Sequence, residues 1–369
     1  MTEPASPQAS RGSSAPAWLW RFSGMRGPSA ERSSGAYALI GRALVALLLS
    51  MLCAAVLIAF SGGNPLSAFA AIASGAAGSP HQIAVSLNRS APYLLAGVGV
   101  ALCFRAGVIN IGAEGQIAFG GLGAAAAAIA LPVANPLFAI ALALLAGAAA
   151  GAAWAALATA IHLFRNVHEV LATLLLNFVA LLLVQQMLAG PIGQFGAGFL
   201  QSPLLPAAAW LPQLAEGFEA HLGIFIAAAA AVVLSFLLWR TRFGFALRVT
   251  GRSRHAATYA GFSLPRLTWG VMLIAGALAG LAGGVEVLGV HRRLIEGFSL
   301  GFGFKAVTVA LLGALEPLAV VPAALFIGML ETGGQSMQRQ IGIPSALVAV
   351  IEGLTMLFVL AATARRYTA

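Results

Sequence analysis

Aspartate is absent from this sequence of 369 residues, and lysine occurs once, as Lys305. All 11 acidic residues are therefore glutamates, and all basic residues except Lys305 are arginines. Charged residues amount to 8% of the chain, whereas a soluble domain carries about 25%. Because 60% of the residues are hydrophobic, a water-soluble fold is excluded. The expected fold class is all-α, a polytopic helical bundle in a membrane.

The missing residue types also exclude several chemistries. Without aspartate there is no Walker B carboxylate, no phosphorylated aspartate and no Ser/His/Asp triad, and Lys305 follows GFGF rather than completing a GxxxxGK[ST] loop. The histidines show no metal-ligand spacing, and Cys53 and Cys103 form neither a disulfide framework nor a zinc site. We therefore expect no metal, cofactor, catalytic residue or ATPase activity in this chain. A membrane-embedded enzyme is disfavoured for the same reason.

The net charge of +9 does not indicate nucleic-acid binding, because the arginines gather in a few loops between apolar runs. Residues 1–35 are rich in Ser, Pro, Gly and Arg and are predicted to form a disordered cytoplasmic tail. Residues 36–363 are predicted to form the transmembrane domain, and residues 364–369 a second cytoplasmic tail. Six arginines in 240–266 mark the most strongly cytoplasmic loop, whereas 61–90 and 189–222 are expected outside.

Both termini on the cytoplasmic side require an even number of crossings, and about ten fit the loop charges best. Eight spans plus a re-entrant pair is the alternative. Arg292 and Arg293 fit poorly, because they would lie outside. The second span is short for a full crossing, so a broken or re-entrant helix is plausible there. The ten predicted spans are 37–60, 91–104, 113–131, 137–163, 170–188, 223–239, 267–290, 306–315, 319–330 and 346–362.

The stretch FRAGVINIGAEGQIAFGG, residues 104–121, interrupts this apolar pattern. It carries Arg105, Asn110, Glu114 and Gln116, and five glycines break up its backbone. An ionisable residue in a membrane segment indicates function, and irregular backbone is tolerated there only where protein or a water-filled cavity covers it. The alternative is a short interfacial loop between two helix ends.

Other polar residues lie near or within predicted spans, and Asn177 stands in the apolar run LATLLLNFVALLL. For each residue alone, a hydrogen bond between helices or a place at a span end is the favoured interpretation. Together they suggest a polar path through the bundle. The many Ala and Gly residues in the spans predict close helix packing. The remaining members of the polar set are Glu286, Lys305, Glu331, Gln335 and Glu352.

The cytoplasmic segment TGRSRHAATYAGFSLPR, residues 250–266, combines arginines with small residues. Ala256, Ala257, Ala260 and Gly261 recur at helical spacing, so we expect a short helix with one small-residue face, ended by Pro265. Such a helix can dock in a groove on a partner protein. The alternative is an ordinary positively charged cytoplasmic loop.

Several of these segments resemble one known family. GVINIGAEGQ (107–116), NVHEVLATLLLNFVA (166–180), GRSRHAATYAGFS (251–263) and residues 301–334 are similar to permease subunits of bacterial ABC importers in the ribose/branched-chain-amino-acid permease superfamily, closest to the nucleoside branch. His168 is an insertion relative to the family pattern. The resemblance covers about 36–362. It implies two permeases, ABC ATPase subunits and an extracytoplasmic substrate-binding protein in a bacterial plasma membrane.

The resemblance also implies roles for particular residues. The loop 251–263 corresponds to the family's ATPase-coupling loop, in which we select Arg252, Ala256, Ala257, Tyr259, Ala260 and Gly261. The expected mechanism is alternating access, in which ATP-driven closure of the partner ATPases turns a cavity inward. The candidates for the path or its gate are Asn110, Glu114, Gln116, Asn177, Glu286 and Lys305.

Three functional alternatives stay open from the sequence. Within the family, the solute could be a simple sugar or autoinducer-2 rather than a nucleoside, or a branched-chain amino acid. In a different class, a stand-alone secondary transporter could use Glu114 and Glu286 for proton coupling.

Overall fold

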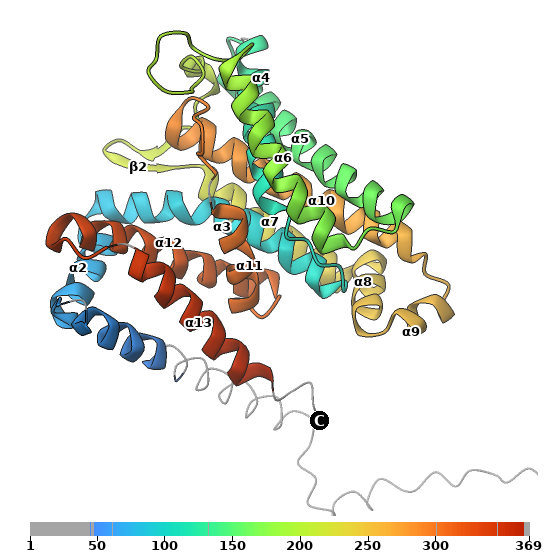
Figure 1. The fold of residues 1–369 in the computed structure, drawn as a ribbon. Coiled ribbons are helices and arrows are strands. Elements are labelled where there is room, and N and C mark those ends of the chain that lie inside the picture. The colour runs from blue at the N-terminus through green and yellow to red at the C-terminus, as the bar shows by residue number, and fades with distance from the viewer. Residues whose placement is uncertain are drawn as a thin grey trace, which may run out of the picture.

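The computed structural model describes residues 45, 48–60, 62–131, 133–299, 301–344 and 346–364. Most of these residues are helical, and Figure 1 shows the helices packed into one bundle, as expected for a polytopic membrane protein. The predicted tail 1–35 and residues 365–369 lie outside the described residues. The helices before the middle of the chain are Leu48–Phe60, α2 (Pro65–Ala77), α3 (Pro80–Arg105), α4 (Ala113–Ala130), α5 (Pro136–Arg165) and α6 (Glu169–Ala189).

The second half of the bundle begins after a short β-hairpin of β1 (Gln213–Ala215) and β2 (Phe218–His221), which follows the 3-10 turn η2 (Ala207–Ala209). Its long helices are α7, α10 and α12, and its short helices are α8, α9 and α11. A π-helical turn, η3, directly continues α10. The bounds are α7 (Gly223–Arg240), α8 (Arg242–Arg252), α9 (Arg254–Tyr259), α10 (Leu264–Glu286), η3 (Val287–His291), α11 (Phe302–Leu312), α12 (Pro317–Ile341) and α13 (Ala346–Ala364).

Within the described residues, six helices are long and apolar enough to cross a membrane, and a seventh span results if Leu48–Phe60 and α2 are taken as one bent span. The six are α3, α5, α6, α7, α10 with η3, and α12. The apolar helices α4 and α13 have 18 and 19 residues. The predicted total of ten crossings and the cytoplasmic position of both termini stay predictions.

The prediction of a short second span was wrong, because α3 is a continuous helix of 26 residues. Its first turns, together with α2, occupy much of the segment 61–90 that was expected as an external connection. The polar residues that lower the hydropathy of these turns have tertiary partners. Ser86 Oγ donates to the Ala76 carbonyl (2.8 Å), and Asn88 Nδ2 donates to the Glu219 carbonyl (2.9 Å). Hydropathy alone therefore underestimated the length of α3.

The predicted pieces 306–315 and 319–330 correspond to α11 and α12, and the break at Glu316-Pro317 is confirmed. The second piece is not short, because α12 has 25 residues and continues through Glu331 and Gln335 to Ile341. Glu331 is accommodated inside the helix by an ion pair with Lys305.

Close helix packing, predicted from the small residues, is confirmed where α10 crosses α4 and α5. A Cβ atom on Gly120 would lie 2.2 Å from the Gly280 Cα atom, and one on Gly151 would lie 2.3 Å from the Gly276 carbonyl oxygen. At these crossings only glycine lets the backbones approach, which is the usual basis of helix association in a membrane.

The connections gather at two ends of the bundle, and Figure 1 shows β2 and α9 on opposite sides. Arg292 and Arg293, which fit the loop charges poorly, lie against the segment 189–222. The Arg292 guanidinium stacks on the Trp210 ring at 4.4 Å, and Arg293 Nη1 donates to Gln201 Oε1 at 2.9 Å. These two arginines therefore share the end of the bundle that carries the predicted external segment.

Candidate functional site

The linker 106–112 between α3 and α4 is non-helical, and three polar residues of α6 hold it in place. Glu169, Thr173 and Asn177 are spaced at i, i+4 and i+8, so they share one face of α6. This face satisfies backbone groups that would otherwise be unpaired in an apolar bundle. The bonds are Ile109 N–H to Glu169 Oε1 (3.1 Å), Ile111 N–H to Thr173 Oγ1 (3.4 Å), Gly115 N–H to Asn177 Oδ1 (2.9 Å) and Asn177 Nδ2–H to the Ile111 carbonyl (2.9 Å).

Asn110 and Gln116 complete the same network from within the linker and α4. Their amide side chains bond to each other, and Asn110 Oδ1 also accepts from the Gly112 N–H at 2.9 Å. Asn110, Gln116 and Asn177 are all buried, with at most 1% exposed. The structure therefore brings these three candidates together around one backbone turn. Their assignment to the path or its gate stays a prediction.

Glu114 lies in the first turn of α4, and its carboxylate caps α11. Its two oxygens accept hydrogen bonds from the backbone N–H groups of Gly301 (3.0 Å) and Gly303 (2.8 Å). A carboxylate is favourable at a helix N-terminus, where unpaired N–H groups and the helix dipole attract negative charge. A Cβ atom on Gly303 would lie 2.0 Å from the Glu114 backbone nitrogen, so glycine is required for this approach. The two interrupted segments of the chain thus meet at Glu114.

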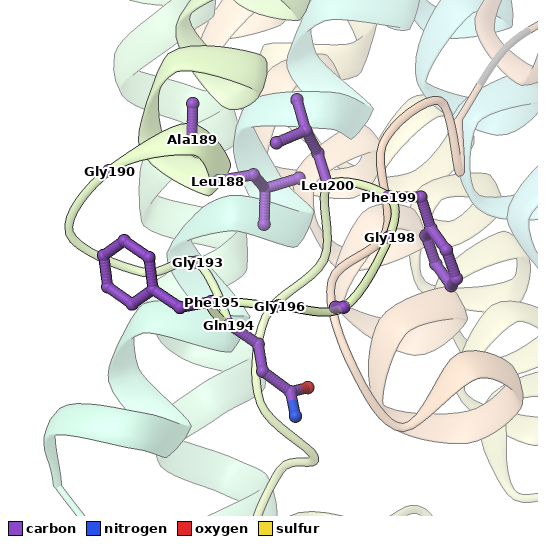
Figure 2. A pocket seen from close by; sticks show the side chains of 11 residues that line it. Leu188, Ala189, Gly190, Gly193, Gln194, Phe195, Gly196, Gly198, Phe199 and Leu200 are labelled. Atoms are coloured by element: carbon purple, nitrogen blue, oxygen red, sulfur yellow. The ribbon is translucent and has the colours of Figure 1, made fainter.

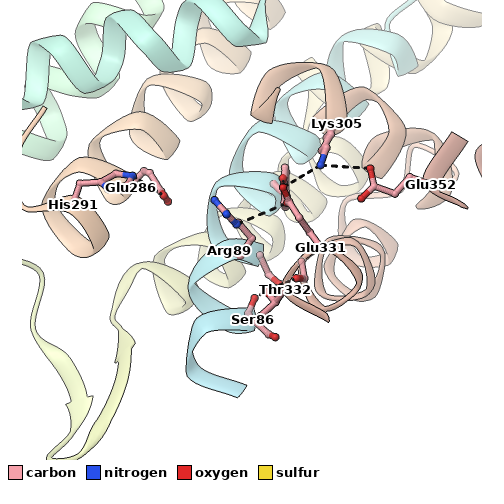
Figure 3. A network of polar contacts seen from close by, with 11 residues as sticks. Ser86, Arg89, Glu286, His291, Lys305, Glu331, Thr332 and Glu352 are labelled. Atoms are coloured by element: carbon pink, nitrogen blue, oxygen red, sulfur yellow. Dashed lines mark hydrogen bonds and ion pairs between the residues drawn. The ribbon is translucent and has the colours of Figure 1, made fainter. Parts of the chain in front are cut away.

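Lys305 lies in a second polar cluster, which α3, α11, α12 and α13 form together (Figure 3). Lys305 Nζ is 3.1 Å from Glu331 Oε1 and 3.6 Å from Glu352 Oε2, and Arg89 Nε is 3.8 Å from Glu331 Oε2. Two cations therefore balance two carboxylates. Lys305 was among the predicted path residues, whereas Arg89 was not, because it lies in the segment 61–90 that was expected to be an external connection.

Two aromatic rings border this charged cluster. The Tyr93 ring meets the Phe302 ring edge-on, with centroids 5.2 Å apart, and the Tyr93 hydroxyl donates to Glu331 Oε2. The Arg89 guanidinium lies 5.5 Å from the Phe302 centroid. Arg89, Tyr93 and Phe302 were not among the predicted site residues.

A cavity of about 380 Å³ lies between α3, the β-hairpin and η3. Glu286 is 2% exposed, and its Oε1 is 3.4 Å from His291 Nε2. The predicted path residue Glu286 therefore faces a cavity, whereas Asn110, Glu114, Gln116 and Asn177 do not line it. The lining residues are Val85, Asn88, Arg89, Gln213, Glu219, Glu286, Gly289, Val290, His291 and Arg292.

A second cavity, of about 320 Å³, lies in the loop after α6, and Figure 2 shows Phe195 and Phe199 at its sides. Its lining comes from residues 188–200 alone and contains no ionisable side chain. It therefore has little of the chemistry that a selective polar path needs.

The predicted coupling segment folds as α8 and α9 at the end of the bundle opposite the hairpin (Figure 1). The expected helix is shorter than predicted: α9 ends at Tyr259, and Pro265 lies in the first turn of α10 instead of ending α9. Proline fits a first helical turn because no N–H bond is required there. Ala257 is buried, so it does not share the exposed face, whereas Arg252, Ala256, Tyr259, Ala260 and Gly261 are exposed.

The coupling segment contacts the linker directly. Arg254 Nη2 donates to the Gly107 carbonyl at 3.0 Å, and a Cβ atom on Gly251 would lie 2.0 Å from the Arg105 carbonyl oxygen. Nearby, Arg105 Nη2 is 2.9 Å from Glu316 Oε2, and Trp239 Nε1 donates to Glu316 Oε1 at 2.7 Å. The α8–α9 unit, the linker and the α11–α12 turn are therefore joined at one end.

Comparisons with known proteins agree with this architecture. Residues 82–360 match the family described as branched-chain amino acid transport system / permease component. The guanosine ABC transporter permease protein NupP of Bacillus subtilis is 33% identical over 328 residues, covering 88% of this chain and 94% of NupP.

Two further relatives are similar over most of their length. The glucose ABC transporter permease protein TsgB13 of Haloferax volcanii is 38% identical over 74% of each chain. The nucleoside ABC transporter permease protein NupB of Lactococcus lactis is 29% identical over 86% of this chain and 89% of NupB. The resemblance found from the sequence motifs is confirmed: this chain belongs to the permease-component family and is a multi-pass membrane permease subunit of an ABC importer.

Proposed function

We propose that this permease carries nucleosides or closely related small solutes across a bacterial plasma membrane by alternating access. It works with a second permease subunit, ABC ATPase subunits and an extracytoplasmic substrate-binding protein. Similarity over nearly the whole chain to permeases named for guanosine and nucleosides supports the solute class. The relative named for glucose supports a sugar as the second candidate.

The position of the α8–α9 unit, exposed and bonded to the linker, is the observation that supports the mechanism. Tyr259 of this unit is 92% exposed, and Arg254, which is also exposed, donates a hydrogen bond to the Gly107 carbonyl in the linker 106–112. A partner ATPase that docks on the exposed residues can therefore displace the linker and, through Glu114, the N-terminus of α11. ATP binding drives transport only if the ATPase favours one of the two conformations, because a ligand shifts an equilibrium by its differential affinity.

Hydrolysis of ATP belongs to the partner in this proposal. The chain contains neither a GxxxxGK[ST] loop nor any aspartate, so it has no residues for a nucleotide site of the P-loop type. In this proposal, hydrolysis acts on this chain only through the conformational change that the docked ATPase imposes on the α8–α9 unit.

The coupling assignment is tested by replacing Ala260 with tryptophan in the reconstituted complex. Ala260 is exposed, so the indole has room in the isolated chain and interferes only with docking. We expect ATP-driven uptake to fall at least about tenfold, the effect of losing about 1.4 kcal/mol of docking free energy. Gly261→Trp is a less specific test, because Gly261 has a left-handed backbone with φ of +80°. Uptake at the wild-type rate would show that the ATPase docks elsewhere.

The matched control is Ala229→Trp, which places the same side chain on an exposed position of the membrane helix α7. This variant should fold and transport normally. Together the two variants separate loss of docking from a general effect of the added ring.

The solute class is tested by uptake into proteoliposomes that contain the permease, its ATPase and its cognate binding protein. Uptake of labelled guanosine, uridine, glucose and leucine is measured, once with ATP inside the proteoliposomes and once with ATP outside them. We expect saturable, ATP-dependent uptake of the nucleosides. Uptake of glucose alone would support the sugar alternative, and uptake of leucine alone the amino-acid alternative. Nucleoside uptake by the permease alone in a proton gradient would support a secondary transporter.

A further inference from the structure

The cavity between α3, the hairpin and η3 has the size and the polar lining of a small-molecule site. Its volume of about 380 Å³ falls within the range of about 300–1,000 Å³ that is usual for such sites. Asn88 and Arg89 lie on its α3 wall, and Glu286, Gly289 and His291 lie on the opposite wall. A π-helical turn begins immediately after Glu286, and such turns are frequent at functional sites.

Glu286 has an unsatisfied oxygen in this wall. The side chain is 2% exposed and Oε1 faces His291, whereas Oε2 has no hydrogen-bond partner among the described residues. Buried polar atoms almost always have a partner, because an unpaired one costs about 1–3 kcal/mol. Figure 3 shows the Glu286 carboxylate pointing across the gap towards Arg89. This oxygen is buried in the wall of the cavity, and no described residue donates a hydrogen bond to it.

The charges around the cavity decide which donor fits. The charge of Arg89 is already balanced by Glu331, and its guanidinium also lies over the Phe302 ring. Arg292 is engaged with Trp210. An amino acid would supply an ammonium group to Glu286 but would leave its own carboxylate without a free cation. A neutral solute with neighbouring hydroxyl groups can form hydrogen bonds with both walls, because one hydroxyl donates to Glu286 and another accepts from Arg89.

We propose that this cavity is a solute-binding site in which Glu286 and Arg89 bind neighbouring hydroxyl groups, those of a ribose ring or of a free sugar. The inference rests on the proposed transport function and names where this chain recognises the solute. The site lies at the hairpin end, and Arg89 connects it to the ion-paired cluster of Glu331, Lys305 and Glu352.

The test pairs a protein change with a solute change. Uptake of guanosine and of 2′,3′-dideoxyguanosine is measured for the wild type and for Glu286→Gln in the complete reconstituted importer. The ratio of the two kcat/KM values is compared between the proteins, so that the selectivity of the unchanged binding protein cancels. We expect Glu286→Gln to reduce the preference for guanosine at least about tenfold, because a hydrogen bond to a charged group contributes about 1.5–3 kcal/mol. An unchanged ratio would overturn the proposal.

Two controls keep the outcome specific. Glu316→Gln changes a carboxylate at the opposite end and should leave the ratio unchanged. If guanosine is not transported but glucose is, the same ratio is measured with deoxyglucose analogues. Failure of uptake for every hydroxylated solute rejects the proposed function, whereas normal nucleoside uptake with an unchanged ratio rejects only the site.

A second variant covers the possibility that Glu286→Gln does not fold. Val85→Phe fills the cavity from α3, and Ile83→Phe places the same ring at an exposed position two residues earlier, outside the lining. We expect Val85→Phe to lower guanosine uptake at least about tenfold and Ile83→Phe to leave it unchanged. Equal uptake by both variants would overturn the proposal.

Discussion

Two sets of buried polar side chains lie near opposite ends of α3, and they differ in how well they are paired. Around the linker 106–112, Asn110, Glu114 and Asn177 bond to backbone groups of the chain. In the cavity at the hairpin end, Glu286 keeps one oxygen without a partner among the described residues. Paired groups of this kind hold an irregular backbone together, whereas an unpaired buried group is costly and calls for a partner from outside the described residues. Position in a membrane segment alone therefore does not distinguish a structural polar residue from a solute contact.

The largest effect is expected for Glu114→Ala. The change leaves the partly buried N–H group of Gly301 and the buried N–H group of Gly303 without their acceptor, so we expect a loss of about 3 kcal/mol of stability and a lower yield of folded protein. Thermal unfolding in detergent measures the effect. Glu114→Gln should lose less, because its amide oxygen still accepts one bond.

The control for Glu114→Ala is Glu216→Ala, at an exposed position in the hairpin turn, which should unfold like the wild type. A Glu114→Ala protein with normal stability and abolished transport would break the comparison, because Glu114 would then act on the solute rather than on α11.

Asn177→Leu is expected to have the next largest effect. It removes a donor and an acceptor that bind the linker backbone, and polar contacts between membrane helices contribute about 1–2 kcal/mol. The apparent unfolding temperature should fall. Phe178→Leu, one residue further and 58% exposed, should change it little. An equal effect of both variants would contradict a structural role for Asn177.

Glu286→Gln should change stability by less than about 1 kcal/mol in the same assay, because Oε2 has no partner to lose and the contact of Oε1 with His291 is long, at 3.4 Å. The transport selectivity should nevertheless change. A destabilisation as large as that of Glu114→Ala would place Glu286 in the structural set and remove the contrast between the two ends.

The smallest effect concerns His221, at the end of β2. Burial lowers the pKa of His221 below its ordinary value of about 6.5. The unfolded chain therefore takes up this proton at a higher pH than the folded chain does. The stabilisation that depends on neutral His221 should therefore be complete above about pH 6.5. The free energy of unfolding should decrease as the pH falls from there towards the lowered pKa. Unfolding of the wild type and His221→Asn is compared from about pH 8 to pH 5.5; parallel curves would contradict this.

The sequence predicted the bundle, the family and the interrupted segments because each depends on local composition. Apolar runs require a membrane, and glycines mark the places where a helix breaks. The stripe of Glu169, Thr173 and Asn177 could also have been found from its i, i+4, i+8 spacing, but only Asn177 stood out by hydropathy.

Other features could not be predicted locally. The length of α3 depends on partners from α2 and the hairpin, which Ser86 and Asn88 contact, so the segment 61–90 was predicted to be an external connection. The end of α9 and the burial of Ala257 likewise depend on packing against the bundle. The π-helical turn after Glu286 has no recognised sequence pattern.

The sequence by itself determined that this chain is a multi-pass membrane permease, because composition and short motifs carry that information. Only the tertiary structure decided which buried polar groups are satisfied. The Glu114 carboxylate finds its partners 187 and 189 residues away, at Gly301 and Gly303, whereas Glu286 keeps a free oxygen beside a cavity. Hydrogen-bond satisfaction depends on neighbours in space, and the sequence spacing of polar residues does not reveal them.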